Sequence, residues 1–261
     1  AGVPFKEQKI SYSDYLDYWL NNYCKTNLKY NTIQAYETLI KKYIKPYIGK
    51  YRLSTITSVR LNTFITELCE EYDFSRAYFK SILKVVKGSF RDACDLYGFL
   101  KYNPAITLRL PRLDKEKEDI KHLYSQEEID TILNRFKDNE TFTCAFLTSC
   151  YTGMRTGEVF ALTWDDIDLE NKKLTVNKNV LKKNQAGATH GRHISGKATT
   201  MWFFGTCKTP SSYRTIDIGD TLVNALKEYK AEQEANKKEY GDFYMMHYAK
   251  TVKNPYTNKD E

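Results

Sequence analysis

Apolar and aromatic residues recur every three to four positions through most of the first hundred residues, which places them on one face of an α-helix. The pattern falls into four segments separated by polar and glycine-containing stretches. We therefore expect residues 10–100 to form a four-helix domain whose core these side chains fill. The residues that carry the four stripes are Tyr12, Tyr15, Leu16, Trp19, Leu20 and Tyr23; Tyr36, Leu39, Ile40, Tyr43, Ile44 and Tyr47; Leu61, Phe64, Ile65, Leu68 and Tyr72; and Tyr78, Phe79, Ile82, Leu83, Val86, Phe90, Ala93 and Tyr97.

Capping residues set the expected ends of these helices. The second helix should begin near Asn31 and Thr32, whose side chains suit an N-cap, and should stop at Gly49. The fourth helix is long and should end near Gly98.

The helical pattern stops at Asn103 and Pro104, and residues 110–119, LPRLDKEKED, are charged and lack an apolar period. A chain of 261 residues also exceeds the usual size of one domain. We expect a helical domain over residues 1–105, a linker over 106–120 and a second domain over 121–261.

The second domain combines helical and strand patterns. Ser125 and Glu128 form a capping box, and a helix over 141–151 should end at Gly153 in the left-handed conformation. Alternating residues predict a strand over 173–180 and its partner over 213–218, before an amphipathic helix from Asp220. Between the strands, residues 181–206 are interpreted as a basic, β-rich insertion with an apolar edge. The expected fold class is mainly α with a small antiparallel β-sheet.

Basic residues are concentrated in the first half of the chain. Residues 6–112 carry 18 Lys and Arg against 10 Asp and Glu, whereas residues 113–261 carry 22 against 23. Within the second half, residues 171–216 hold nine basic residues and no acidic residue. A polyanionic partner such as nucleic acid would explain this segregation, but a solvated surface would also show it, and charge alone leaves both interpretations open.

Cysteine and histidine patterns favour no metal site. The six cysteines show no CxxC spacing, which favours reduced thiols over disulfides or zinc. His190 and His193 lie in a basic stretch without carboxylate or thiol companions at ligand spacing, so we interpret them as phosphate-facing or solvated. No apolar run reaches about 18 residues, so no membrane span is expected.

Two segments in a fixed order carry the most specific motifs. Residues 148–167, TSCYTGMRTGEVFALTWDDI, resemble the first active-site box of the tyrosine recombinases, the phage-integrase family. Residues 207–216, CKTPSSYRTI, resemble the hairpin-lysine strand of that family. The layout is most similar to integrases of conjugative transposons and temperate phages. The resemblance implies a helical core-DNA-binding domain followed by a mixed α+β catalytic domain that is truncated in this sequence.

The resemblance implies roles for three residues of these boxes. Arg155 would bind the non-bridging oxygens of the scissile phosphate, since a guanidinium is a rigid fork of donors that matches phosphate geometry. The alternative is a surface arginine paired with Glu158 or Asp165. Glu158 would brace the turn around Arg155, or serve as a helix-start carboxylate. Lys208 would protonate the departing 5′ oxygen as a general acid, or contact a phosphate only.

Other residues are expected to hold DNA. Lys80, Lys84, Lys87 and Arg91 recur every three to four residues opposite the apolar stripe of the fourth helix and form a basic ridge. We assign the aromatic stripes themselves to the core and not to a base-stacking platform. The remaining expected DNA contacts are Lys29, Asn31 and Thr32 at a helix start, together with Lys197, Ser212 and Arg214.

The rest of the family's active site is not assigned. No His-x-x-Arg box follows Lys208; His247 and Lys250 have a similar spacing but lie too soon after the hairpin, and Tyr256 is a poor nucleophile candidate. We expect the second box and the nucleophilic tyrosine to lie beyond residue 261, so the stretch shown should bind DNA without cleaving it.

The sequence therefore predicts a site-specific recombinase, the integrase of a mobile element, that joins DNA through a 3′-phosphotyrosyl intermediate without ATP, metal or other cofactor. The expected partner is double-stranded DNA at recombination sites, bound by a homo-tetramer in the bacterial cytoplasm at the nucleoid. The rival interpretation is a non-catalytic DNA-binding or architectural protein of the same fold; a type IB topoisomerase fits the helical first domain less well.

Overall fold

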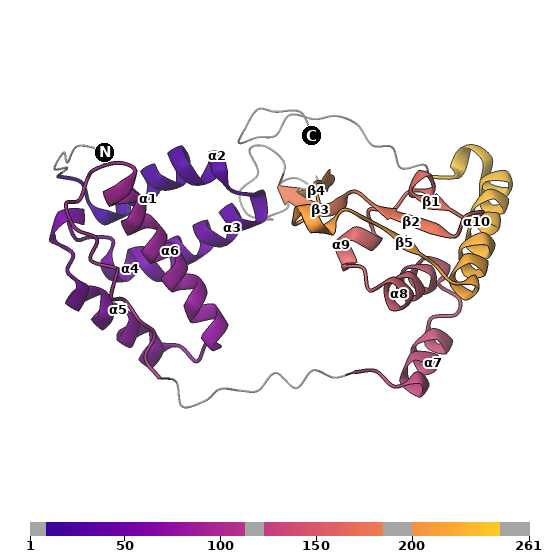
Figure 1. Cartoon of the computed structure of the whole chain (residues 1–261), viewed down its shortest axis with the longest axis horizontal. Coiled ribbons are helices and arrows are strands. Elements are labelled where there is room, and N and C mark those ends of the chain that lie inside the picture. The colour runs from indigo at the N-terminus through magenta and orange to yellow at the C-terminus, as the bar shows by residue number, and fades with distance from the viewer. Residues whose placement is uncertain (1–8, 113–122, 185–199, 246–261) are drawn as a thin grey trace. The chain divides into compact units, whose positions relative to one another are not determined.

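The structure is a computed structural model that describes residues 9–112, 123–184 and 200–245. The chain divides into two compact units, residues 1–121 and 122–261. Figure 1 shows helices throughout the first unit, and helices with small sheets in the second. The expected fold class, mainly α with small antiparallel sheets, is confirmed.

Four helical stretches build the first unit, as the apolar stripes predict. The first runs through α1 (Tyr12–Trp19), a π-helical turn (Leu20–Cys24) and α2 (Lys25–Asn27). The second runs through α3 (Tyr30–Leu39), a π-helical turn (Ile40–Ile44) and α4 (Lys45–Ile48). After a 3₁₀ turn (Leu53–Thr55) come α5 (Ser58–Glu71) and the longest, α6 (Arg76–Asp95).

The predicted start of the second helix is wrong by two residues. Lys29, not Asn31 or Thr32, occupies the N-cap position, with no side-chain hydrogen bond. The backbone N–H of Thr32 donates to the Lys29 carbonyl oxygen over 2.9 Å, so main-chain bonding sets the start of this helix.

The predicted stop of the second helix is confirmed, because Gly49 is its C-cap. A Cβ at Gly49 would lie 2.6 Å from the carbonyl oxygen of Lys45, which only glycine avoids.

All four helical stretches contribute to the core of the first unit, and its largest aromatic residues include those that join α1 to α6. Tyr12, Tyr15 and Trp19 are buried there, and the Tyr12 ring stacks on Phe90 with centroids 4.7 Å apart. The buried tyrosine hydroxyls are hydrogen-bonded: the hydroxyls of Tyr12 and Ser89 share a hydrogen bond of 2.8 Å, and Tyr15 donates to the Ser89 carbonyl oxygen over 2.7 Å. The aromatic stripes are thus core, as predicted.

The second unit begins with α7 (Gln126–Arg135), α8 (Glu140–Thr152) and the short α9 (Thr156–Val159). The predicted capping box of Ser125 and Glu128 is confirmed, since each donates from its backbone to the side chain of the other. A 3₁₀ turn (Trp164–Asp166) leads into the strands, and α10 (Asp220–Tyr240) and a 3₁₀ turn (Gly241–Phe243) follow them.

Two small sheets complete the described part of the second unit. β1 (Ile167–Asp168), β2 (Lys173–Val176) and β5 (Arg214–Asp217) form one antiparallel sheet, in which Leu174 pairs with Ile216. β3 (Asn179–Asn184) and β4 (Thr200–Gly205) form the other, a hairpin that occupies the described part of the predicted insertion.

The predicted pairing of the strands over 173–180 and 213–218 is confirmed, but the first of them is not continuous. It breaks at Asn177 and Lys178, whose side chains turn away to bind Asp166.

Candidate functional site

Arg155 stands on a sharp turn between α8 and α9. Gly153 ends α8 in the left-handed conformation, with φ 62° and ψ 20°, as the sequence predicts. Arg155 then takes an extended conformation, with φ −69° and ψ 147°, as the N-cap residue of α9. This change of direction exposes the Arg155 side chain at the start of a helix.

Gly157 lets this turn approach the β3/β4 hairpin. A Cβ at residue 157 would overlap Oδ1 of Asn179 and lie 3.1 Å from the carbonyl oxygen of Val180. A residue with a side chain would push the Arg155 turn away from β3, so steric contact with β3 requires glycine at position 157.

The guanidinium of Arg155 is anchored through one nitrogen. Nη1 donates to Oε1 of Glu158 over 2.7 Å and to the Ser212 hydroxyl over 3.1 Å. Nε and Nη2 make no hydrogen bond to any residue that the structure describes, and the side chain is 58% exposed. One edge of the guanidinium is therefore fixed by the protein, while the Nε–Nη2 edge is available to a ligand with two acceptor oxygens.

Glu158 is the buried centre of this cluster, with 3% of its side chain exposed. Its Oε2 accepts from the backbone N–H of Arg155 over 3.2 Å and from Nη2 of Arg214 over 3.0 Å. Burial raises the pKa of Glu158, but the hydrogen bonds from Arg155 and Arg214 outweigh burial and lower the pKa below its usual value. Glu158 therefore stays ionised between two cations. The pairing that the sequence offered as a surface alternative for Arg155 is thus present, but it uses only Nη1.

Lys208 belongs to the segment that delivers Ser212 to Arg155. Cys207 is buried and anchors the segment, whereas Lys208 is exposed. A 3₁₀ turn (Pro210–Ser212) then buries Ser212, whose hydroxyl shares a hydrogen bond of 2.9 Å with Thr209. The structure thus brings Arg155, Glu158, Ser212 and Arg214 into direct contact and leaves Lys208 exposed on the same short segment.

Sequence reasoning missed a second buried carboxylate in the second unit, that of Asp166. Asp166 accepts from the backbone N–H and the hydroxyl of Thr163, both over 2.8 Å, from the Asn177 side chain over 2.9 Å, and from Lys178. Burial raises the pKa of Asp166, but these hydrogen bonds lower it below 3.8 overall. The available sequence signal was the polar pair Asn177 and Lys178, which interrupts the strand alternation.

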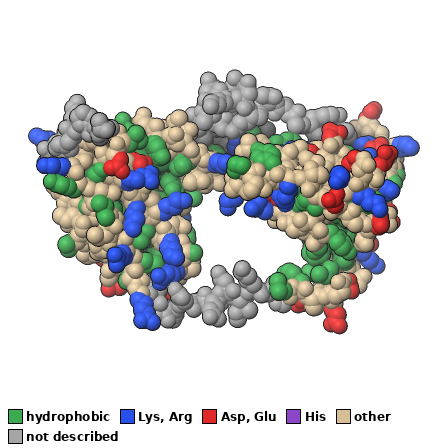
Figure 2. All heavy atoms as spheres, viewed as in Figure 1, with side chains coloured by type: hydrophobic (Ala, Val, Ile, Leu, Met, Phe, Trp, Pro, Cys, Tyr) green, Lys and Arg blue, Asp and Glu red, His purple; other side chains and the backbone are tan. Residues whose placement is uncertain are grey.

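In the first unit, several expected DNA contacts line one groove of about 740 Å³. Lys29 and Thr32 line it from α3 and the turn before it, and Lys84, Lys87 and Arg91 line it from α6. Figure 2 shows Lys and Arg side chains gathered over α6. Asn31 and Lys80 are exposed but do not line the groove.

Arg91 differs from the lysines of this groove because a buried carboxylate holds it. Its Nε and Nη2 both lie 2.9 Å from Oδ1 of Asp92, which is 5% exposed. The other carboxylate oxygen of Asp92 accepts from Nε1 of Trp19 over 2.8 Å. The Arg91 guanidinium is thereby fixed to the core of the first unit.

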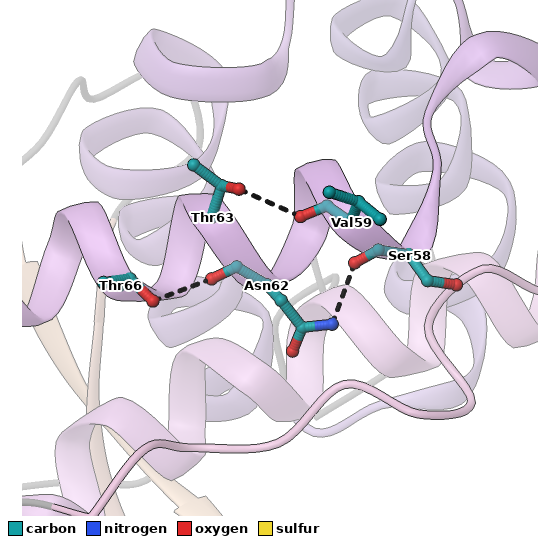
Figure 3. Close-up of a pocket in the computed structure, with 5 residues that line it drawn as sticks. All are labelled: Ser58, Val59, Asn62, Thr63 and Thr66. Carbon is teal, nitrogen blue, oxygen red and sulfur yellow. Dashed lines mark hydrogen bonds between the residues drawn. The ribbon is translucent and has the colours of Figure 1, made fainter.

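A second groove, of about 460 Å³, follows α5 and is a weaker candidate (Figure 3). The side chains of Asn62, Thr63 and Thr66 donate to carbonyl oxygens one turn earlier in the same helix. Their donors are thus used locally, and no charged residue lines the groove.

Some predicted positions lie outside the described residues: Lys197, His190, His193, His247, Lys250 and Tyr256. Within the described ranges, no group of three or more His, Cys, Asp or Glu could hold a metal ion. No helix among those same ranges is long and apolar enough to span a bilayer.

Comparison with known families matches both units. Residues 122–257 match the family described as "Phage integrase family", and residues 11–69 match "Phage integrase, N-terminal SAM-like domain". A relative described as "Tyrosine recombinase XerC-like", from Caldanaerobacter subterraneus subsp. tengcongensis, is 28% identical over 248 residues, which cover 94% of this chain and 61% of the relative. The chain thus spans about three fifths of the length of that relative.

Two solved structures show the same fold. One is a variant of the Tn1549 transposon integrase in complex with a circular intermediate DNA, with TM-score 0.67 and 18% identity over 92% of this chain and 70% of that chain. The other is a lambda integrase tetramer bound to a Holliday junction, with TM-score 0.52 and 20% identity over 64% of this chain and 47% of that chain.

Proposed function

Because the chain belongs to the phage integrase family, we propose that it acts as a site-specific recombinase of a mobile element, which cuts and rejoins duplex DNA through a 3′-phosphotyrosyl intermediate. The observation that carries this proposal is the geometry of Arg155. Glu158 and Ser212 bind Nη1 and leave the Nε–Nη2 edge open. A carboxylate that only neutralised Arg155 could instead have paired with the Nε–Nη2 edge through both of its oxygens.

The open edge of Arg155 matches two non-bridging oxygens of a phosphodiester. In the proposed step, a tyrosine oxygen attacks phosphorus, and the bond from phosphorus to the 5′ oxygen breaks. Arg155 offsets the charge on the non-bridging oxygens, because fixed donors stabilise developing charge without reorganising. We propose that Lys208 gives a proton to the leaving 5′ oxygen, so that a hydroxyl departs. The reacting tyrosine is not assigned to any residue that the structure describes.

We propose that the groove of the first unit holds the DNA backbone. Lys84, Lys87 and Arg91 supply positive charge along one side, and Lys29 and Thr32 supply donors on the other. Contacts of this kind position a protein on DNA without reading its sequence. Asn31, Lys80 and Lys197 remain proposed contacts beside this set.

The wider setting is proposed on the same basis. Four copies would assemble on two DNA sites; the likeness in fold to the lambda integrase tetramer on a Holliday junction supports this. The phosphotyrosyl link conserves the energy of the broken phosphodiester, so the proposed reaction needs neither ATP nor a metal ion. A DNA substrate places the protein in the bacterial cytoplasm, at the nucleoid.

The test uses the full-length protein and duplex DNA that carries the joined ends of the element. Wild type and Arg155→Ala are incubated with this DNA in the presence of EDTA and examined for a protein–DNA adduct that survives denaturant. We expect an adduct with wild type and none with Arg155→Ala. If wild type shifts the DNA but forms no adduct, the protein is a non-catalytic DNA-binding protein, and the proposal is wrong.

A further inference from the structure

Arg214 differs from Arg155 in the direction of its donors. The sequence places Arg214 among the DNA contacts, yet both terminal nitrogens donate inward. Nη1 donates to the backbone carbonyl oxygen of Ser212 over 2.9 Å, and Nη2 donates to Oε2 of Glu158 over 3.0 Å. The Arg214 side chain is 31% exposed, about half the value for Arg155. Its position on β5 thus points its charge at the carboxylate and not at solvent.

Glu158 divides its two oxygens between the two arginines. Oε1 accepts from Nη1 of Arg155, while Oε2 accepts from Nη2 of Arg214 and from the backbone N–H of Arg155. Because Arg214 occupies Oε2, the carboxylate meets the Arg155 side chain through one oxygen only. This division keeps the Nε–Nη2 edge of Arg155 open.

We infer that Arg214 is a positioning residue, which acts through Glu158 and Ser212 to hold the Arg155 guanidinium in the plane that receives the phosphate. The inference rests on the proposed function. In this inference Arg214 acts on the Glu158 carboxylate and the Ser212 carbonyl oxygen, and not on DNA. It ties β5 to the turn before α9, so that the hairpin segment and the arginine turn form one unit.

The consequence of losing Arg214 follows from the charge of Glu158. Without Arg214, the buried carboxylate would keep one cation, and Oε2 would keep only the backbone N–H of Arg155, so it could turn toward a second N–H of the Arg155 side chain. Carboxylates bind guanidinium in pairs of parallel hydrogen bonds whenever geometry permits. Glu158 would then compete with the phosphate for Arg155, which slows the chemical step without removing a DNA contact.

The test measures single-turnover adduct formation and DNA affinity separately in the full-length protein. We expect Arg214→Ala to slow adduct formation at saturating DNA by at least about tenfold, with the DNA dissociation constant within about twofold of wild type. Arg214→Lys should recover part of the rate, because the lysine ammonium can reach Oε2 of Glu158. It cannot also bind the Ser212 carbonyl oxygen, as the two terminal nitrogens of the guanidinium do together.

Lys173→Ala is the matched control. Lys173 lies on β2 of the same sheet and pairs with Asp217 over 2.7 Å, but that pair is exposed and does not contact Arg155. Its removal should leave the rate unchanged. Melting temperatures of all variants show whether a lower rate reflects a loss of folding.

The pH dependence of the rate adds a readout that a structural role would not move. Arg155, at the N-cap of α9, and Arg214, from β5, donate to the Glu158 carboxylate. Without Arg214, fewer hydrogen bonds counteract the effect of burial on Glu158, so the pKa of Glu158 rises. The acid limb of the pH–rate profile should therefore move to higher pH. Arg214→Lys should move the limb back toward wild type.

Three outcomes would overturn the inference. If Arg214→Ala weakens DNA binding but keeps the wild-type rate at saturation, Arg214 is a DNA contact. If Lys173→Ala slows the reaction equally, the effect comes from the sheet as a whole. If wild type itself forms no adduct, the proposed function fails, and this inference fails with it.

Discussion

The two units hold their cations in different ways. On α6 of the first unit, Lys80, Lys84 and Lys87 are exposed, and none forms an ion pair with a described residue. In the second unit, Glu158 binds Arg155 and Arg214, and Asp166 binds Lys178. The first arrangement supplies charge, whereas the second supplies charge at a fixed position. DNA attraction needs only the former, and stabilising one transition state needs the latter.

Arg91 shows that the first unit also contains a fixed cation. Asp92 holds it in place, and Trp19 holds Asp92 in turn. In the proposed DNA complex, Arg91 would set a position along the DNA backbone, while the lysines beside it on α6 would adapt to the phosphates within reach. The comparison is therefore between two kinds of cation, and Arg155, Arg214 and Lys178 of the second unit are of the fixed kind.

The largest effect is expected at Glu158. Glu158→Gln removes the charge that holds two arginines together, so the rate of adduct formation should fall by about 100-fold or more, the scale of losing a preorganised oxyanion donor. Single-turnover kinetics at saturating DNA measures this. The matched variant is Glu170→Gln, an exposed glutamate on the turn between β1 and β2, which should keep the wild-type rate. An unchanged rate in Glu158→Gln would show that Arg155 needs no fixed position.

Asp166 tests the same distinction through stability. Asp166→Asn weakens the ion pair between buried Asp166 and Lys178. Because Lys178 is 25% exposed, the expected loss of unfolding free energy is about 2–3 kcal/mol, below the range for fully buried pairs. Chemical denaturation measures the loss. Asp165 is exposed and adjacent in sequence, so Asp165→Asn should change stability by less than about 0.5 kcal/mol. Equal losses in the two variants would contradict a special role for Asp166.

Acid should weaken the second unit through these carboxylates. Hydrogen bonds lower the folded-state pKa values of Asp166 and Glu158 below the ordinary values of 3.8 and 4.5. The two ionised carboxylates therefore stabilise the fold fully above these ordinary values, and this stabilisation is lost as the pH falls through the folded-state pKa values. We expect stability to fall steeply below about pH 4, and Asp166→Asn to flatten that fall. Denaturation at a series of pH values measures it, and parallel curves for wild type and variant would contradict the assignment.

The smallest effects are expected at the lysines of α6. Replacing Lys84 or Lys87 by Gln should weaken DNA binding a few-fold and reduce the slope of log K against log salt by about 0.9 for each phosphate that the variant no longer neutralises. Lys50→Gln, an exposed lysine outside the groove, is the matched control. Fluorescence anisotropy at several salt concentrations gives both quantities. If the loss of DNA affinity in Lys84→Gln does not change with salt, Lys84 acts as a cation at a fixed position, like Arg155, and not as a diffuse charge.

Local signals predicted much of this molecule. The apolar stripes, the capping box of Ser125 and Glu128, and the left-handed Gly153 all depend on residues within a few positions of one another, so the sequence displays them directly. Arg155, Glu158, Ser212 and Arg214 were selected from two motifs, and the structure brings them into contact.

What escaped prediction depends on contacts between distant residues. The strand break at Asn177 arises because Asp166, on another element, binds its side chain. The inward direction of Arg214 depends on Glu158, 56 residues earlier in the chain. The groove that unites Lys29 with Lys84 exists only once α3 packs beside α6. Periodicity identifies the buried face of each element but does not show which side chains meet across elements.

The most direct test of the central claim removes the charge that Arg155 is proposed to bind. DNA with a neutral methylphosphonate at the scissile position lacks one non-bridging oxygen and the phosphate charge. Single-turnover adduct formation is compared for wild type and Arg155→Ala on this DNA and on ordinary DNA. If Arg155 stabilises the charged non-bridging oxygens, its removal should slow the reaction far less on methylphosphonate DNA than on ordinary DNA. An equal slowing on both would show that Arg155 acts elsewhere, and would contradict the account.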